Sequence, residues 1–549
     1  MMKLINLSLV LILVLSGTAP LSAQSGATFP AGSLQRFRKG EVIVELRPGA
    51  SIDAINARHR TTTIERIYGT NFYRLLTPNG KKQKKWRKKL SKDADVLSAS
   101  LNPVVTSPSL FARSTVSFPD GFVKPGLTFA DFDAQRELFD MLNLEEVNLR
   151  SRGAGTVVAV IDTGVDFSHP VFAGRLWEDE RQNADLAGDG IDTDDDGLMD
   201  DARGWDFVDN DNDPSEKAGD PETTVAGHGT FIGGLIAMLA PDCRILPIRA
   251  FPPEGISDAF TVAAAVKYAA DHGADVINLS LGSPDVLPLL EDAINYAQER
   301  GAVLVAAVGN ENSEAPPQYP SNSADVIAIA AIDLSSRKAA FSNYGRHVNL
   351  SAPGVGLISA YPGEGTAAYA SWSGTSFAAP LATAEAALVL SVDARNETVK
   401  NILEETAISI DEMNPGFAGK LGNGRINPLG ALRSLNVAAD AIPVSDIRSQ
   451  IELSAGPANT AARGRASFTI TNAGQEFTAE FNNLSVRTGY KLFVNGEEIG
   501  SEVSANLGNL VFRFSTMPGD SQDIAMQKIC APTSSLRLGN DSGANKKRT

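Results

Sequence analysis

Histidine, cysteine and long hydrophobic runs are all scarce in this chain, which has five histidines and two cysteines in 549 residues. No hydrophobic stretch reaches the length of a membrane span without a charge or a helix breaker, and the run near the N-terminus is short for such a span. The mature chain is therefore expected to have no transmembrane segment. Because histidine is the side chain that most often transfers protons in catalysis, each of the five can be weighed as a candidate base.

The two cysteines, Cys243 and Cys530, allow one disulfide at most. Cys243 precedes an apolar strand, and an isolated cysteine in such a place is commonly a buried free thiol. A secreted protein would permit a bond between the two residues. Both alternatives stay open.

The N-terminal hydrophobic run has the organisation of a secretory signal peptide. Lys3 precedes an apolar run from Leu7 to Leu15, and small residues follow up to Ala23. The run is short for a membrane span, and small residues at its end are typical of a cleavage site. We expect residues 1–23 to be a signal peptide and the protein to be secreted or extracytoplasmic.

Charge divides the chain into a basic N-terminal part and an acidic remainder. Residues 1–118 hold 18 Lys and Arg against 6 Asp and Glu, a net charge of +12, which leaves about −28 for the rest of a chain whose total is −16. The eight positive charges between Lys81 and Lys92 fit a solvated helix face better than a nucleic-acid site. The acidic remainder also disfavours nucleic acid as a partner.

Buried strands alternate with helices over residues 130–437, which predicts an α/β domain. A parallel sheet with helices on both faces accounts for this pattern. The tail differs, because four stretches alternate with period two, and this predicts a small antiparallel β-domain at 451–530 after a linker at 438–450. Residues 531–549 are expected to be disordered. The expected strands of the sheet are 157–161, 244–248, 275–279, 302–307 and 326–331.

A serine stands among small residues at the start of an apolar helical run. Ser376 lies within Gly374-Thr-Ser-Phe-Ala-Ala-Pro380, and the run Leu381 to Leu390 follows. Pro380 suits the first turn of a helix, where its missing N–H costs little. A helix start carries free N–H groups that favour negative charge, so this serine is either a nucleophile or an ordinary cap.

A base and an orienting acid are needed to activate such a serine. His228 stands out among the five histidines because it lies in Gly227-His-Gly-Thr230, directly before an apolar stretch. Asp162 ends the buried strand Val157–Ile161 and begins Asp162-Thr-Gly164, which is where open α/β sheets place their sites. Taken alone, Asp162 would be a turn cap.

The three motifs, in the order Asp, His, Ser, resemble those of the subtilisin-like serine proteases (subtilases). The resemblance implies Ser376 as nucleophile, His228 as general base and acid, and Asp162 as the group that fixes the tautomer of His228. Many subtilases have a second histidine where this chain has Phe231, for which we expect a packing role.

The same resemblance implies an oxyanion donor and a cleft. Asn310, which follows the strand Ala302–Val308 and Gly309, matches the asparagine of the family that contacts the oxyanion. Two strand ends are expected to line the cleft and to pair with an extended peptide by backbone hydrogen bonds. The substrate-binding residues predicted in this way are Ser280, Leu281, Gly282, Ala307 and Gly309.

The basic N-terminal part resembles a subtilase pro-domain. Residues 36–103 read as a small α+β unit with strands at Glu41–Leu46 and Asn71–Leu76 and a helix-like stretch between Gly80 and Leu101. The resemblance implies that the pro-domain, residues 24–118, assists folding and blocks the cleft as an intramolecular inhibitor. Cleavage somewhere in 103–125 would release it.

A dense acidic stretch from Asp189 to Asp201 suggests a structural calcium site. Its alternating carboxylates suit Ca²⁺, which prefers several oxygen ligands, although the twelfth position of an EF-hand loop is occupied by Arg203. A solvated acidic loop is the alternative. The predicted ligands are Asp192, Asp194, Asp196 and Asp200, and the chemistry itself is expected to need no cofactor.

These observations favour a secreted serine endopeptidase, made as a zymogen, that hydrolyses proteins or peptides through an acyl-enzyme. One alternative is an inactive relative that binds peptides or surface partners, and another is a scaffold that acts through its basic N-terminal part. The presence of all four implied catalytic residues speaks against both.

Overall fold

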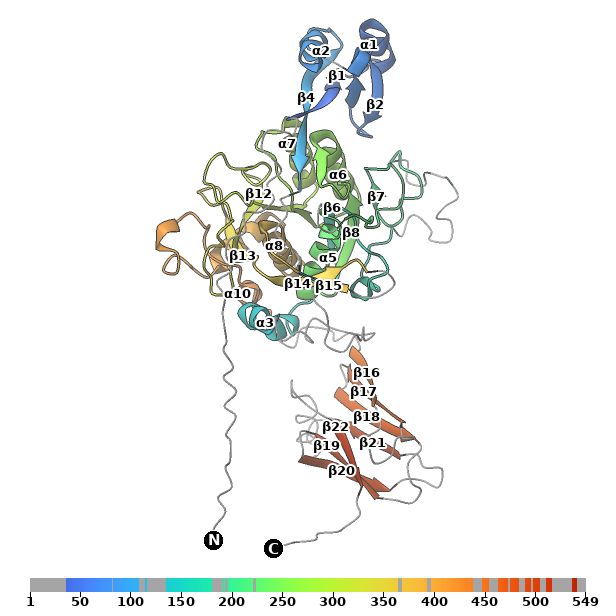
Figure 1. Ribbon diagram of the computed structural model, residues 1–549, viewed down its shortest axis with the longest axis vertical. Helices are drawn as coiled ribbons and strands as arrows, with labels where there is room; N and C mark the ends of the chain where they lie inside the picture. Colours follow the sequence, from blue (N-terminus) through green and yellow to red (C-terminus); the bar gives the residue numbers. More distant parts are fainter. Residues whose placement is uncertain are drawn as a thin grey trace, which may run out of the picture. The chain divides into compact units, whose positions relative to one another are not determined.

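The computed structural model forms two compact units, Met1–Val437 and Ala438–Thr549 (Figure 1). In the first unit it describes residues 36–437 apart from 81, 108–113, 116–134, 180–189, 191, 193–195, 221–223, 364–367 and 393–395. In the second it describes the strands β16 to β22. The predicted signal peptide, Asp194 and Cys530 lie outside the described residues.

The N-terminal part is an α+β unit with a small core of its own. The strands Glu41–Leu46 and Asn71–Leu76 were predicted and are confirmed by β1 and β3. The helix-like stretch 80–101 is shorter than expected, because α2 ends at Leu90 and the strand β4, which lies between β1 and β9 in the sheet, follows. The elements are β1 (Phe37–Leu46), α1 (Ile52–His59), β2 (Thr62–Arg66), β3 (Phe72–Leu76), α2 (Gln83–Leu90) and β4 (Val96–Thr106), with sheet order β2-β3-β1-β4-β9.

A parallel sheet forms the centre of the first unit, as predicted. Every strand pairing in it is parallel, and the order is β13-β12-β11-β10-β6-β8-β7. All five predicted strands are found. The strands are β6 (Val157–Asp162), β7 (Trp205–Asp206), β8 (Arg244–Arg249), β10 (Val276–Leu279), β11 (Val303–Ala307), β12 (Val326–Ile332) and β13 (Leu350–Pro353).

Helices cover both faces of this sheet. Successive side chains of a strand point to opposite faces, and because the strands are largely apolar, both faces are buried against helices. In β6, Val158 and Val160 pack in the core under α5 and α8, whereas Ala159 and Ile161 pack in the core under α6 and α7. The residues of these strands are buried on both sides. The helices are α5 (His228–Leu239), α6 (Ala259–Asp271), α7 (Pro288–Glu299) and α8 (Thr375–Leu390).

Shorter elements complete the unit. A short strand, β9 (Ile256–Asp258), joins the edge of the N-terminal sheet. A hairpin of β14 (Leu357–Tyr361) and β15 (Ala368–Trp372) is extended by β5 (Ser114–Thr115). The remaining helices are α3 (Arg136–Leu142), α4 (Leu144–Asn148), α9 (Asn396–Thr406) and α10 (Pro428–Ser434).

The second unit is an antiparallel β-domain, as predicted, with strand orders β16-β17-β18-β21 and β20-β19-β22. Two predicted boundaries are wrong. β16 begins at Ile447, inside the predicted linker, and β22 pairs with β19 inside the tail that was expected to be disordered. The strands are β16 (Ile447–Leu453), β17 (Arg463–Thr471), β18 (Gly474–Asn482), β19 (Gly489–Val494), β20 (Glu497–Val503), β21 (Leu510–Ser515) and β22 (Leu536–Asn540).

The described residues include helices that can be compared with a membrane span and one of the two cysteines. None of the described helices combines the length and hydrophobicity needed to cross a membrane. Cys243 is a buried free thiol, and burial raises its pKa to about 12, so it carries no thiolate at neutral pH.

Candidate active site

The carboxylate of Asp162 and the imidazole of His228 lie in direct contact. Asp162 Oδ1 is 2.8 Å from His228 Nδ1 and also accepts the backbone N–H of Thr163 at 2.8 Å. Both side chains are almost completely buried. Because the carboxylate can only accept, Nδ1 carries a proton, and a neutral imidazole then presents an unprotonated Nε2.

Two glycines allow His228 to begin α5 so close to the end of β6. Gly227, the N-cap residue, has φ +86°, and a Cβ there would collide with the ring of Tyr361. A Cβ at Gly229 would collide with the carbonyl oxygen of Gly164. Gly229 is therefore required for the approach of the helix to the end of the strand that carries Asp162, and Gly227 for its approach to β14.

Ser376 lies in the first turn of α8, as predicted, whereas Pro380 lies further into the helix than expected. Proline has no N–H, so the carbonyl of Ser376 lacks its normal partner four residues on. The hydroxyl of Ser280 donates to this carbonyl instead, at 2.8 Å. Further hydrogen bonds continue from Ser280 through Asn278 to Thr383 of the same helix, so a buried polar network fixes the helix start against β10.

Asn310 reaches the same helix start from the end of β11. Its Oδ1 accepts the backbone N–H and the hydroxyl of Thr375 at 2.9 and 3.0 Å. Because a backbone N–H can only donate, the atom that faces it must be the amide oxygen. The Nδ2 of Asn310 is therefore available for a substrate oxygen.

Three polar atoms at this point are buried and have no hydrogen-bond partner among the described residues. They are His228 Nε2, Ser376 Oγ and Asn310 Nδ2. Buried polar atoms are normally paired, so each such atom needs an explanation. A base, a hydroxyl and an amide donor that converge at one helix start are suited to acyl transfer. The four predicted catalytic residues are thus gathered in one place.

An aromatic cluster encloses His228. Its ring centroid lies 5.6 Å from Trp372 and 5.2 Å from Phe377, the residue after Ser376. Phe231 is fully buried, with its ring centroid 4.5 Å from Phe377. Phe231 therefore packs against Trp372 and Phe377 in this cluster, in agreement with the expected packing role.

The last strand of the N-terminal unit enters this region and pairs with its walls. β4 pairs with β9 in antiparallel register. Thr106 then exchanges two backbone hydrogen bonds with Gly282, at 3.0 and 2.9 Å, and the N–H of Ser107 donates to the carbonyl of Gly255 at 2.9 Å. The N-terminal unit thus occupies backbone groups of Gly282, one of the residues predicted to pair with an extended peptide.

Opposite charges join the same two parts. Arg38 and Arg74, from the basic unit, both contact the carboxylate of Asp258, at 3.1 and 3.2 Å. Arg36 pairs with Asp285. These ion pairs agree with the expectation that a basic N-terminal part lies against an acidic domain.

The predicted cleft residues have different surroundings. Gly282 pairs with the extended segment at Thr106, and Ser280 supports the helix start, while binding of a substrate by Gly282 stays a prediction. Leu281 and Ala307 have side chains buried in the hydrophobic cores, and Ala307 pairs with Ile329 of β12. The pairing of β10 with β11 ends one residue earlier, at Leu279 and Ala306, so a pairing of Ala307 with a peptide stays a prediction.

Gly309 has φ +98°, and a Cβ there would come within 2.6 Å of Asn343 Nδ2. Its carbonyl accepts the N–H of Asn343 at 2.9 Å. The glycine therefore allows the turn that leads from β11 to Asn310. A direct contact of Gly309 with substrate stays a prediction.

Sequence reasoning missed a second backbone edge that pairs with the N-terminal unit, which is Gly255 and β9. The only local signal was Gly255 followed three residues later by Asp258, whose carboxylate caps α6 by accepting the N–H of Thr261 at 3.1 Å. Nothing in that pattern indicates a peptide-binding edge, because β9 acquires its partner only in the folded molecule.

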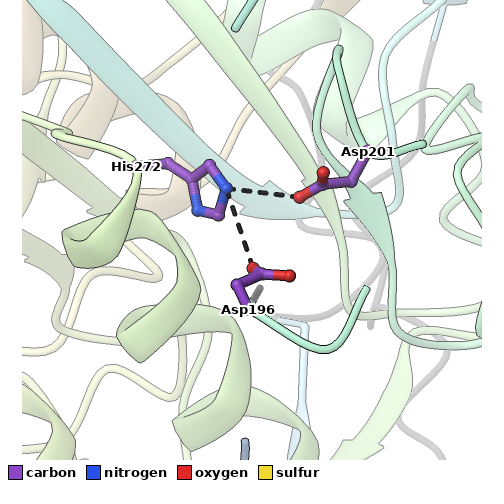
Figure 2. Close-up of side chains that lie close together, drawn as sticks. All are labelled: Asp196, Asp201 and His272. Atoms are coloured by element: carbon purple, nitrogen blue, oxygen red, sulfur yellow. Dashed lines mark ion pairs between the residues drawn. The ribbon is translucent and has the colours of Figure 1, made fainter. Parts of the chain in front are cut away.

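The predicted calcium ligands that the structure describes are not gathered around one point. Asp192 accepts backbone N–H groups of its own loop, and Asp200 accepts the N–H of Gly190. Figure 2 shows a different group, in which the imidazole of His272 points toward the carboxylates of Asp196 and Asp201, at 3.8 and 3.2 Å. A nitrogen ligand suits calcium poorly, so this group does not fit the predicted site.

Comparisons with known proteins agree with this geometry. The model of the subtilase family matches residues 153–430, which include all four predicted catalytic residues. The model of the fervidolysin N-terminal prodomain matches residues 23–102, close to the predicted pro-domain.

Two relatives illustrate the similarity. The thermophilic serine proteinase of Bacillus sp. (strain AK1) is 37% identical over 51% of this chain and 62% of its own length, so the match leaves more than a third of that protein uncovered. Thermitase of Thermoactinomyces vulgaris is 34% identical over 52% of this chain and 90% of its own length.

Among solved structures, fervidolysin from Fervidobacterium pennivorans, described as a keratinolytic enzyme related to subtilisin, aligns with a TM-score of 0.56. The alignment covers 88% of this chain and 76% of that one, at 20% sequence identity, and so concerns the fold alone. Together, the family match and the relatives show that this chain belongs to the subtilase family of serine-type endopeptidases and carries an N-terminal prodomain, as a protease made as a zymogen does.

Proposed function

We propose that this protein is a secreted serine endopeptidase in which Asp162, His228 and Ser376 form the catalytic triad and Asn310 completes the oxyanion hole. The observation that carries the proposal is that three buried polar atoms, on residues which contacts with Thr375 and Phe377 bring to the start of α8, have no partners among the described residues: Nε2 of His228, Oγ of Ser376 and Nδ2 of Asn310. The substrates are proteins or peptides bound as an extended strand.

In the proposed mechanism, Ser376 Oγ attacks the peptide carbonyl carbon while His228 Nε2 takes the hydroxyl proton. Asp162 holds Nδ1 and stabilises the imidazolium that forms. Asn310 Nδ2 and the free N–H of Ser376 at the helix start donate to the oxyanion.

Collapse of the tetrahedral intermediate breaks the C–N bond, and His228 returns the proton to the amine that leaves. The acyl group remains on Ser376. A water molecule then attacks this ester with His228 as base, which releases the acid product and restores the enzyme.

The secreted protein is proposed to be inhibited by its own pro-domain until that domain is cut off. Thr106 and Ser107 pair with Gly282 and Gly255, and Ser114 pairs with Ser371, next to the Trp372 that contacts His228. The connecting residues 108–113 lie outside the described residues. Because the chain pairs with the walls of the site on both sides of this connection, we place the maturation cut within it.

Sequencing of the mature N-terminus tests this proposal. The wild-type protein is expected to begin at a residue within 109–114, and full-length Ser376→Ala is expected to keep its pro-domain. A mature N-terminus outside this window would contradict the assigned cut. Efficient maturation of purified Ser376→Ala would contradict the assignment of the nucleophile.

A further inference from the structure

A buried carboxylate outside the triad joins the two elements that carry Asp162 and His228. Glu216 Oε2 accepts hydrogen bonds from the hydroxyl of Thr163 at 3.1 Å and from the N–H and the hydroxyl of Thr230 at 3.2 and 3.1 Å. Thr163 directly follows Asp162 at the end of β6, and Thr230 lies in the first turn of α5.

The contacts of the two threonines make Glu216 their common acceptor. The hydroxyl of Thr163 accepts the N–H of Gly229 at 2.9 Å, and the hydroxyl of Thr230 accepts the N–H of Asp166 at 2.9 Å. Each hydroxyl has a single proton, and both protons are donated to Glu216. The carboxylate therefore sets the direction of both hydroxyls and links strand and helix.

The segment that carries Glu216 is itself fixed beside the end of β6. The N–H of Glu216 donates to the carbonyl of Val165 at 3.0 Å, and the N–H of Val165 donates to the carbonyl of Pro214. Its neighbour Lys217 is engaged elsewhere, since its ammonium pairs with Asp213 at 2.5 Å. Glu216 is thus held by backbone pairing and does not depend on a surface ion pair.

We propose that Glu216 is a positioning residue for the Asp162–His228 pair. Resting on the proposed function, this inference assigns a role in the reaction to a residue that touches neither the substrate nor the reacting atoms. Its carboxylate keeps the start of α5 against the end of β6, and when ionised it adds a negative charge that favours the imidazolium formed at His228.

The charges around Glu216 set the direction of this effect. Asp162 faces it from β6 and His228 belongs to the helix turn it contacts, while Lys217 and Asp213 of its own segment pair with each other. Burial, opposed by hydrogen bonds from Gly227 and Thr163 and assisted by the charge of Asp162, raises the pKa of Glu216 to about 7. Glu216 therefore ionises near neutral pH, where serine proteases of this design need an unprotonated histidine.

The test is the rate of labelling by a small fluorophosphonate, measured from pH 5 to 9. The protein is produced as the full-length chain and is labelled after maturation. Such a probe needs no knowledge of the preferred peptide. With Glu216→Gln, the plateau rate is expected to fall several-fold and the rising limb to move to lower pH by about half to one unit, because a neutral amide no longer favours the imidazolium. Glu216→Asp, which keeps the charge, is expected to keep the wild-type limb at a reduced rate.

Glu314→Gln is the matched control, because Glu314 is an exposed residue that pairs with Lys420 on the surface of the same domain. This variant should label like wild type. If Glu216→Gln fails to fold, Thr163→Val removes one of the two linking hydroxyls and must itself lower the plateau rate.

A wild-type rate and limb in folded Glu216→Gln, or a wild-type rate in Thr163→Val, would overturn the positioning role alone. Labelling that persists in Ser376→Ala would instead overturn the proposed function on which the inference rests. The two failures are therefore distinguishable in one set of measurements.

Discussion

At the scale of single residues, the molecule separates polar groups that are paired from those left for a substrate. Asn310 is the clearest case, because its oxygen is fixed by Thr375 while its Nδ2 has no partner among the described residues. Glu385 is a different case, a carboxyl buried in the middle of α8 whose Oε1 accepts the N–H of Asn427 while its Oε2 also has no partner among the described residues.

Asn310→Ala tests the oxyanion assignment. Loss of the amide donor is expected to lower kcat by about 100- to 1,000-fold with little change in KM, the loss known for such a donor in a subtilisin. Steady-state kinetics on a fluorogenic peptide measures both constants. A kcat within a few-fold of wild type would show that Asn310 does not contact the oxyanion.

Glu385→Gln tests a pH-dependent contribution to stability. Burial, opposed only by the N–H of Asn427 at 3.0 Å, raises the pKa of Glu385 to about 8. Between pH 4.5 and 8 the unfolded chain has lost this proton and the folded chain keeps it, so the wild-type free energy of unfolding falls as pH rises.

Gln has no such proton, although its buried amide adds a cost that does not change with pH. The melting temperature of Glu385→Gln, relative to wild type, is therefore expected to rise steadily from pH 5 to 8. Thermal unfolding across this range checks it, with Glu314→Gln as control. A difference that stays constant with pH would contradict the assignment.

Residues also differ in how well their roles could be predicted from the sequence. The proposed triad and Asn310 could be predicted because each of these residues stands in a short motif with its own glycine frame. Glu216 and β9 were not, because their partners come from segments far away in the chain and no local pattern marks them. Of the predicted calcium ligands, Asp192 and Asp200 bond to nearby backbone, which a spacing rule cannot foresee.

At the scale of elements, the start of α8 depends on a substitution of one hydrogen bond for another. Pro380 removes the N–H that would pair with the carbonyl of Ser376, and Ser280 supplies a hydroxyl in its place. The apolar run predicted where α8 would lie. The role of Pro380 in this helix could not be predicted, because it depends on Ser280, which follows β10 and contacts the helix start only in the folded molecule.

A double-mutant cycle at Ser280 and Pro380 tests this arrangement. Ser280→Ala leaves the buried carbonyl of Ser376 unpaired and is expected to lower the free energy of unfolding by about 1–3 kcal/mol. In a Pro380→Ala background, residue 380 offers an N–H to the same carbonyl, so Ser280→Ala is expected to cost less. Chemical denaturation of the four proteins gives the coupling energy, and strictly additive effects would contradict the account.

At the scale of the whole first unit, charge and strand pairing act together on the cleft. The basic N-terminal part lies against Asp258 and Asp285, while its last strand pairs with β9 and Gly282. The charge imbalance was visible in the sequence, and the sheet and its helices followed from the alternation of strands. The continuous sheet from β2 to β9 could not be predicted from the sequence, because it joins two parts of the chain that each appeared self-contained.

Salt is expected to weaken inhibition by the pro-domain after cleavage. Screening of the attraction between the two parts lowers the stability of their complex, whereas the strand pairing is little affected. The activity of freshly matured enzyme should therefore rise between low salt and about 1 M NaCl. Enzyme purified free of its pro-domain is the control, and an equal salt response in both samples would contradict the role of charge.

Ser376 is proposed to be a nucleophile activated by His228 and Asp162. Covalent labelling by a fluorophosphonate, followed by mass spectrometry of the modified peptide, tests this role most directly. A single adduct is expected on Ser376 in the matured wild type, with none in Ser376→Ala and strongly slowed labelling in His228→Ala. An adduct on another residue, or undiminished labelling of Ser376→Ala, would contradict it.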